Sequence, residues 1–365
     1  MVKTTISIIK CDVGSLAGHH TVPEPLLKIA ERKLSEAQES GLINSHFVFH
    51  AGDDLELLMV HQRGESNEEI HKLAWDTFQE AAKKAVDLKL YAAGQDILKT
   101  SFSGNIRGLG PGVAEMEIEE RKSDPIIVFA ADKTEPGAFN FPLFKIFADP
   151  FNTAGLVIDP NMTGGFKFEV LDVYENKKVV LKCPEEMYDL IALIGTPGQY
   201  VISHVWRASD DLVCAATSTT RLSLIAGKYV GKDDPVMLVR TQMNFPATGE
   251  ILSPYTLGHF VAGFMRGSHN GPLLPVKKNS SISFFDGPPV VSCLAFSMKN
   301  GKLTEPVDCF DQPYWDYVRM KISQKAEEIR KQGFIGPAML PMSELEYTGV
   351  METLKELEKR FKIRK

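Results

Sequence analysis

One short stretch of the sequence combines a nucleophile, two adjacent carboxylates and a phenol. Lys232 is followed directly by Asp233 and Asp234, and Tyr229 lies three residues before the lysine. Adjacent carboxylates suit a hard cation such as Mg²⁺, which binds oxygen and little else. A lysine held beside such cations favours its neutral amine, which can attack a carbonyl and form a Schiff base. The phenol of Tyr229 can then move protons at the neighbouring carbon.

The same stretch is also compatible with an ordinary surface turn. Gly227, Gly231 and Pro235 flank the lysine and the aspartates, and charged residues between glycine and proline are common in loops. The choice between a turn and a reactive site therefore depends on the rest of the chain.

Further carboxylates follow predicted strands elsewhere in the sequence. Asp12 comes after the β-branched run 5–10, and Asp132 comes after the continuous apolar run 125–131. Both runs are typical of buried strands. His19 follows Asp12 within a glycine-containing loop, a plausible arrangement for ligands. Carboxylates at strand ends can converge in space although they lie far apart in the sequence.

A second pair of adjacent carboxylates, Asp53 and Asp54, separates the predicted strands 45–50 and 55–61. Gly-Asp at this position is typical of a hairpin turn. Such a turn needs one aspartate beside its glycine and does not need two, so the second carboxylate points to a ligand role.

Helical patterns alternate with these strands and favour an α/β fold. Apolar residues recur at helical spacing over 23–41, and a capping box at Ser66 to Glu69 opens a second helix that runs to about Leu88. The glycine-rich residues 103–112 can present backbone N–H groups to phosphate, although glycine richness alone is weak evidence. No internal repeat or linker divides the chain, so we expect a single large domain over residues 1–365.

Composition excludes several classes of protein. The chain has 365 residues, 44% of them hydrophobic and 24% charged, with a formal net charge of −6. This charge argues against a general nucleic-acid binder. The five cysteines are scattered without a CxxC pair, which suggests neither a zinc site nor a disulfide framework. We predict no signal peptide and no membrane span, and therefore a cytoplasmic enzyme.

The order of these motifs resembles the bifunctional fructose-1,6-bisphosphate aldolase/phosphatases of archaeal type. The resemblance covers nearly the whole chain and rests on the motifs at 12–15, 18–19, 52–54, 94–96, 132–133 and 229–235. It implies an α-β-β-α layered sandwich assembled as a homo-octamer. It also implies a gluconeogenic reaction that joins two triose phosphates, dihydroxyacetone phosphate and glyceraldehyde 3-phosphate, into the sugar bisphosphate. Mg²⁺-dependent hydrolysis of the 1-phosphate then gives fructose 6-phosphate.

The resemblance also assigns roles to individual residues. Lys232 becomes the Schiff-base lysine and Tyr229 the acid/base of the aldol step. Several Mg²⁺ ions per site are expected on Asp12, His19, Asp53, Asp54, Gln95, Asp132, Asp233 and Asp234. Substrate is expected to contact His19, Tyr91, Gly104, Asn105, Asp132, Lys133, Gln242, Arg266, Asp286 and Tyr347. His19 can serve either the metal or the substrate, because Mg²⁺ prefers oxygen ligands.

Two other functions stay open on the sequence alone. The first is a plain Mg²⁺-dependent sugar phosphatase in which Lys232 only contacts phosphate. The second is a non-catalytic protein that binds sugar phosphates. The aspartate pairs argue against the second, because so much like charge is costly to bury without a metal.

Overall fold

Two stacked β-sheets form the centre of the protein. The computed structural model describes residues 3–97, 110–218, 220–221, 232–261, 271–281, 288–331 and 349–364. The first sheet has five strands. In spatial order these are β10 (Thr220–Arg221), β4 (Gly112–Glu119), β1 (Lys3–Asp12), β3 (Asp54–His61) and β2 (Ser45–Ala51).

The second sheet is larger, with eleven strands among the described residues. Its main path runs through β14 (Leu274–Pro275), β15 (Val290–Lys299), β5 (Asp124–Asp132), β11 (Val236–Arg240), β9 (Val213–Thr217), β8 (Tyr200–Arg207), β6 (Phe166–Asp172), β7 (Lys177–Cys183) and β18 (Lys362–Ile363). Strands β16 (Lys302–Leu303) and β17 (Val307–Asp308) pair with β15, and β12 (Phe260–Val261) pairs separately with β13 (Gly271–Pro272).

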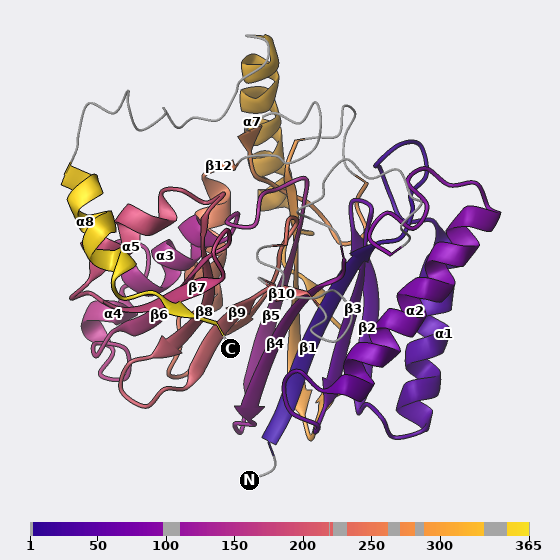
Figure 1. Ribbon diagram of the computed structural model, residues 1–365, viewed down its shortest axis with the longest axis horizontal. Coiled ribbons are helices and arrows are strands. Elements are labelled where there is room, and N and C mark those ends of the chain that lie inside the picture. The colour runs from indigo at the N-terminus through magenta and orange to yellow at the C-terminus, as the bar shows by residue number, and fades with distance from the viewer. Residues whose placement is uncertain are drawn as a thin grey trace.

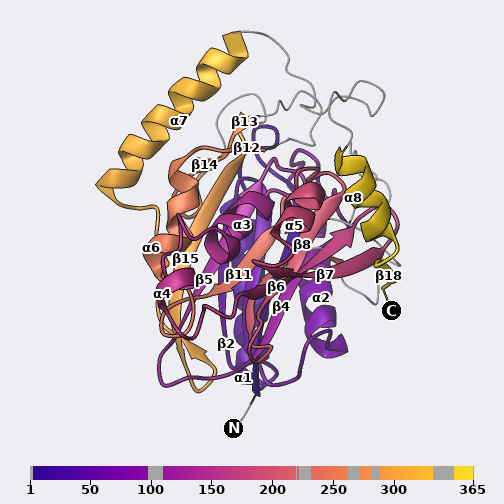
Figure 2. The same cartoon turned by 90° about the vertical axis from the view of Figure 1, so that its left-hand side faces the viewer.

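Helices cover the outer faces of both sheets (Figure 1), which confirms the predicted α-β-β-α sandwich. Helices α1 (Glu24–Glu39) and α2 (Glu68–Asp87) pack on the first sheet. The second sheet carries α3 (Asn140–Ala148), α4 (Gly155–Ile158), α5 (Met187–Ile194), α6 (Thr248–Leu252), the 3₁₀ turn η1 (Ser253–Thr256) and α8 (Gly349–Glu358). Helix α7 (Pro313–Lys331) extends beyond the layers, as Figure 2 shows. Within the described ranges, no helix has the length and apolar character that a membrane span requires.

The start of α2 differs from the predicted capping box. The side chain of Asn67 accepts hydrogen bonds from the backbone N–H groups of Glu69 and Ile70. Ser66 has a φ of +56° and lies outside the helix. Asn67 is therefore the cap, and the prediction that placed Ser66 in this role was wrong by one residue.

An apolar layer fills the space between the two sheets, and it becomes polar at one end. On β1, Ile8 faces the second sheet and is followed on the same face by Lys10. On β5, Ala130 faces the first sheet and is followed by Asp132. Glu56 of β3, paired with Lys10 across the strands, is also buried. The site described below lies where this layer changes from aliphatic to ionisable side chains.

A buried histidine within the first sheet predicts a loss of stability in acid. The Ser7 hydroxyl donates to Glu115 Oε1 at 2.7 Å and accepts from His61 Nε2 at 2.9 Å. The backbone N–H of Arg63 donates to His61 Nδ1 at 3.3 Å, which suits a neutral imidazole. Burial lowers the pKa of His61 to about 4.

The pKa of folded His61 lies below its unfolded value of about 6.5, so protonation of this histidine favours the unfolded chain. The folded state is therefore fully stable above pH 6.5 with respect to this residue, and it loses stability as the pH falls toward 4. We expect the free energy of unfolding to fall by about 2 kcal/mol between pH 7 and pH 5 through this residue alone. His61→Gln, which does not titrate, should flatten the profile in chemical denaturation by that amount. An unchanged pH profile in the variant would contradict this assignment.

Candidate metal and substrate site

The first sheet supplies its site carboxylates from one end of its strands. Asp12 ends β1 and is directly opposite Asp54, the first residue of β3. Asp53 lies in the tight turn between β2 and β3, where Gly52 has a φ of +54°. The antiparallel register therefore brings Asp12, Asp53 and Asp54 together, as the strand-end positions predict.

The second sheet supplies its carboxylates from the strand ends that face those of the first sheet. Asp132 is the last residue of β5, and Asp234 lies two residues before β11, the neighbour of β5. Two hydrogen bonds hold these strand ends together: Asp234 N–H donates to the Thr134 carbonyl at 3.0 Å, and Thr134 N–H donates to Asp234 Oδ1 at 2.7 Å. The loop after β5 and the loop before β11 are thereby fixed to each other.

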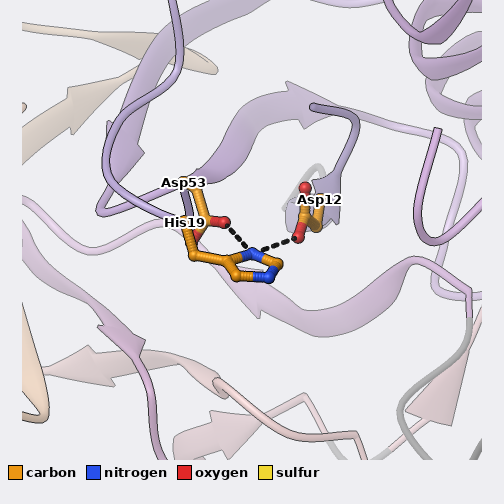
Figure 3. Close-up of side chains that lie close together, drawn as sticks. All are labelled: Asp12, His19 and Asp53. Carbon is orange, nitrogen blue, oxygen red and sulfur yellow. Dashed lines mark hydrogen bonds and ion pairs between the residues drawn. The ribbon is translucent and has the colours of Figure 1, made fainter. Parts of the chain in front are cut away.

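Among the residues that the structure describes, two groups can hold a metal ion, and Asp12, His19 and Asp53 form the first (Figure 3). Their ligand atoms all lie within 4.8 Å of one another, and all three residues are buried. His19 Nδ1 lies 2.8 Å from Asp53 Oδ2 and 3.9 Å from Asp12 Oδ2. We name this the first-sheet group.

Asp54, Asp132 and Asp234 form the second group, also within 4.8 Å of one another. It joins one residue of the first sheet to two of the second, and we name it the bridging group. The Oδ2 atom of Asp132 is buried and receives no hydrogen bond from the described residues. A set of carboxylate oxygens with one atom lacking a donor fits a hard divalent cation such as Mg²⁺.

Burial and mutual repulsion raise the pKa of most of these carboxylates. Burial raises the pKa of Asp12 and Asp132 well above the ordinary value, and neighbouring aspartates raise both further. The pKa of Asp234 is raised to about 7, again mainly by burial. Burial acts in the same direction on Asp53, but Lys133 and His19 outweigh it and hold the pKa of Asp53 below the usual range. Ionised carboxylates in this site are therefore costly unless positive charge lies beside them.

Three buried lysines offset part of this charge, and each contacts two aspartates. Lys10 contacts Asp54 and Asp234, Lys133 contacts Asp53 and Asp132, and Lys232 contacts Asp96 and Asp233. The seven aspartates of the cluster are Asp12, Asp53, Asp54, Asp96, Asp132, Asp233 and Asp234. If all seven were ionised, they would exceed the three lysines by four charges, which bound divalent cations would help to offset.

Lys232 is buried within this cluster. Its Nζ lies 3.0 Å from Asp233 Oδ1 and 3.1 Å from Asp96 Oδ2. Burial alone would lower the pKa of Lys232, but the charges of Asp233 and Asp96 outweigh it and raise the pKa well above the ordinary value. The lysine side chain passes directly over Gly112, where a Cβ would lie 2.8 Å from Lys232 Cγ. These contacts keep the amine in the cluster.

Tyr91 and Gln95 lie near the first-sheet group. The ring of Tyr91 meets the ring of His19 edge-on, with centroids 4.8 Å apart, and 46% of Tyr91 is exposed. Gln95 precedes Asp96, which accepts hydrogen bonds from the backbone N–H of Asp12 at 3.0 Å and from Lys232 at 3.1 Å. Asp96 was not predicted as a site residue, although it follows Gln95 directly in a turn.

Gln242 lies apart from the cluster. It follows the other end of β11, where its exposed side chain donates to Thr248 Oγ1 at 3.1 Å. The five residues of β11, which span roughly 15 Å, lie between Gln242 and Asp234. Within one chain, the structure does not bring this predicted phosphate contact to the other site residues. The remaining predicted residues lie outside the described ranges: Tyr229, Gly104, Asn105, Arg266, Asp286 and Tyr347.

The close approach of Gly52 to Asp132 gives a sharp test of the site. A Cβ at position 52 would lie 1.6 Å from Asp132 Oδ2, and the φ of +54° also disfavours any side chain. We expect Gly52→Ala to displace the Asp53–Asp54 turn and to weaken Mg²⁺ binding roughly 10- to 100-fold, as the loss of a supporting contact does in other metal sites. Isothermal titration with Mg²⁺ measures this effect.

Gly41→Ala is the matched control. Gly41 follows the end of α1 with a φ of +76°, and a Cβ added there would have no neighbour within 4 Å. The substitution therefore imposes a comparable backbone strain without the clash. Equal Mg²⁺ affinity in the two variants would contradict the prediction, because it would show that the clash with Asp132 does not affect the site.

The fold and the acidic cluster define an α-β-β-α sandwich protein that carries the ligand set of a divalent-cation site. A family model described as fructose-1,6-bisphosphatase matches residues 3–362. The chain therefore belongs to this fructose-1,6-bisphosphatase family.

Similar proteins share its full length. The chain is 58% identical over 361 residues to a protein of Ignicoccus hospitalis, with 99% of this chain and 93% of the relative covered. It is 56% identical to one of Sulfurisphaera tokodaii, with coverage of 99% and 94%. It is 53% identical to one of Methanothermobacter marburgensis, with coverage of 98% and 99%. All three relatives are named fructose-1,6-bisphosphate aldolase/phosphatase.

Proposed function

We propose that this protein is a bifunctional, gluconeogenic fructose-1,6-bisphosphate aldolase/phosphatase. It condenses dihydroxyacetone phosphate with glyceraldehyde 3-phosphate and then hydrolyses the 1-phosphate of the product to give fructose 6-phosphate. The observation that carries the proposal is the placement of Lys232: its amine contacts Asp96 and Asp233 in a cluster of seven aspartates, five of which belong to the two groups that can hold a metal ion. The names of the full-length relatives support the same pair of activities.

In the aldol step, Lys232 first gives up the proton that Asp233 and Asp96 help it to hold, and the neutral amine then attacks the ketone of dihydroxyacetone phosphate. Loss of water gives a Schiff base. Removal of a proton from the adjacent carbon then gives the nucleophile that attacks the aldehyde of the second triose phosphate. We propose Tyr229 as the group that moves this proton. Asp96 and Asp233 hold the lysine in place, since both contact its Nζ. Water finally releases the sugar bisphosphate and restores the amine.

In the phosphatase step, the two aspartate groups would hold Mg²⁺ ions, several per site. Bound there, the ions supply charge that polarises the phosphoryl group and activates water. Asp233 and Gln95 are proposed to complete their ligand shells. Lys133, which contacts a member of each group, is proposed to contact a substrate phosphate. Tyr91, beside His19, is proposed to contact the sugar.

We propose that the protein works as a homo-oligomer, an octamer by likeness to its family, in the cytoplasm. The position of Gln242 supports an oligomer: the family likeness assigns this residue to substrate, yet it lies at the far end of β11 from its own cluster. A neighbouring copy would allow Gln242 to reach a site that is not its own. Size-exclusion chromatography with light scattering tests the assembly.

A coupled assay with purified protein tests the proposed function. Supplied with both triose phosphates and Mg²⁺, the protein should produce fructose 6-phosphate and inorganic phosphate in equal amounts. EDTA should prevent phosphate release. Phosphate release from fructose 1,6-bisphosphate without any condensation of triose phosphates would favour a plain phosphatase. Ligand binding without phosphate release would favour a non-catalytic binding protein.

A further inference from the structure

We infer that Lys10 is a positioning residue of the bridging group. It acts as a built-in cation that holds Asp54 and Asp234 together and supplies part of the positive charge that they would otherwise take from a divalent ion. The inference rests on the divalent cations of the proposed function. It concerns a residue that the sequence motifs do not single out and that has no role in the chemistry described above.

The contacts of Lys10 are confined to one metal-binding group. Its Nζ lies 2.6 Å from Asp54 Oδ2 and 3.7 Å from Asp234 Oδ2. Lys133 instead links the two groups to each other, and Lys232 contacts two aspartates outside both groups. Lys10 is therefore the lysine among these three whose amine contacts two ligands of the same proposed ion.

The backbone of Lys10 is held on both sides. It lies within β1 and pairs with Glu56 of β3 on one side and with Gly112 of β4 on the other. Its side chain is fully buried, at 0% exposure, so it reaches the two carboxylates from within the packed inter-sheet layer. A lysine fixed in this way joins the first sheet, through Asp54, to the second sheet, through Asp234.

The surroundings of Lys10 contain more acid than the two ligands alone. Glu56 is fully buried, and neither of its carboxyl oxygens has a hydrogen-bond partner among the described residues. It lies opposite Lys10 in the strand register and points to the same inter-sheet layer. Removal of the lysine would therefore take away the cation in contact with both Asp54 and Asp234 and increase their repulsion in a region of low dielectric constant.

This role predicts a specific interaction between Lys10 and Mg²⁺. Without divalent ions, Lys10 is the cation that Asp54 and Asp234 share. With an ion bound to the bridging group, the ion takes over much of that role. Loss of Lys10 should therefore be most damaging in the absence of Mg²⁺. A side chain that only filled space would matter equally in both conditions.

The test compares thermal unfolding of full-length wild type and Lys10→Met in EDTA and in saturating Mg²⁺. We expect the midpoint to rise with Mg²⁺ in both proteins, and to rise more in the variant. Linkage then requires the variant to bind Mg²⁺ more tightly, by roughly tenfold or more given the loss of a charge so close to the ligands. Calorimetric titration with Mg²⁺ measures that affinity directly.

Lys178→Met is the matched control, since Lys178 pairs with Glu169 at 2.7 Å on the second sheet, away from the cluster. Its Mg²⁺ response should equal that of the wild type. If Lys10→Met does not fold in either condition, the double variant Lys10→Met with Asp54→Asn decides, because removal of one carboxylate charge should restore folding in EDTA.

Equal destabilisation of Lys10→Met with and without Mg²⁺, or failure of the double variant to recover, would overturn the role of Lys10. A wild-type protein that neither binds Mg²⁺ nor gains stability from it would instead overturn the proposed cofactor. The two failures are therefore distinguishable.

Discussion

Replacement of Lys232 with arginine is expected to abolish aldol condensation and to leave appreciable phosphatase activity. The guanidinium keeps a positive charge between Asp96 and Asp233, but it does not form a Schiff base with a ketone. We expect the condensation rate to fall by at least about 10³-fold, in line with the loss of a covalent nucleophile. Release of phosphate from fructose 1,6-bisphosphate should persist.

Borohydride trapping separates the two roles of the lysine. Wild type incubated with dihydroxyacetone phosphate and borohydride should gain a reduced adduct at Lys232, whereas Lys232→Arg should gain none. Lys232→Ala provides a second comparison, in which the charge is also lost. Equal loss of both activities in the arginine variant would contradict the division of roles between lysine and metal ligands.

Replacement of Asp132 with asparagine is expected to remove most of the phosphatase activity. The substitution keeps the shape of the side chain but removes the charge of a carboxylate whose Oδ2 receives no hydrogen bond from the described residues. Because Asp132 belongs to the bridging group and also contacts Lys133 at 2.8 Å, we expect a loss on the order of 10³-fold in Mg²⁺-dependent phosphate release. Titration of the rate with Mg²⁺ should show a higher half-saturating concentration than in the wild type.

Asp172→Asn is the control for this prediction. Asp172 is also a buried aspartate at the end of a strand of the second sheet, but its Oδ1 accepts from the backbone of Tyr174 and it lies outside both metal-binding groups. Its replacement should leave the Mg²⁺ dependence unchanged. If Asp132→Asn retained the wild-type Mg²⁺ dependence, the bridging group would not be a metal site.

Much of the site follows from residues that end or begin strands. Asp12 and Asp132 are predicted to converge because each follows a strand, and the Asp53–Asp54 pair is predicted to bind a ligand because a hairpin turn needs only one aspartate beside its glycine. The antiparallel register then places Asp12 opposite Asp54, as such an argument requires. These positions could be predicted because they depend only on where each apolar run ends and on the alternation of side chains between the two faces of a strand.

Other parts of the site depend on packing that no local pattern reveals. Lys10 occupies a position of β1 that faces the apolar inter-sheet layer, and its burial is explained by contacts with Asp54 of the first sheet and Asp234 of the second. Asp96 is recognisable only when Lys232 and the backbone of Asp12 are both seen to contact it. The position of Gln242 could not be predicted from the sequence. Its distance from the cluster depends on which end of β11 faces the site, and only the folded structure shows this.

The first-sheet group is built from one sheet and the bridging group from two. This difference sets the order in which the two groups should lose their geometry when the protein unfolds. Asp12, His19 and Asp53 all belong to the first sheet and its loops, whereas Asp54 faces partners from the second sheet. A slip of the sheets by a single residue, about 3.3 Å, would spread the bridging carboxylates and leave the other trio intact. During gradual denaturation we therefore expect a cation bound to the bridging group to leave before one bound to the first-sheet group. Catalysis would then end while the first-sheet group still holds its ion.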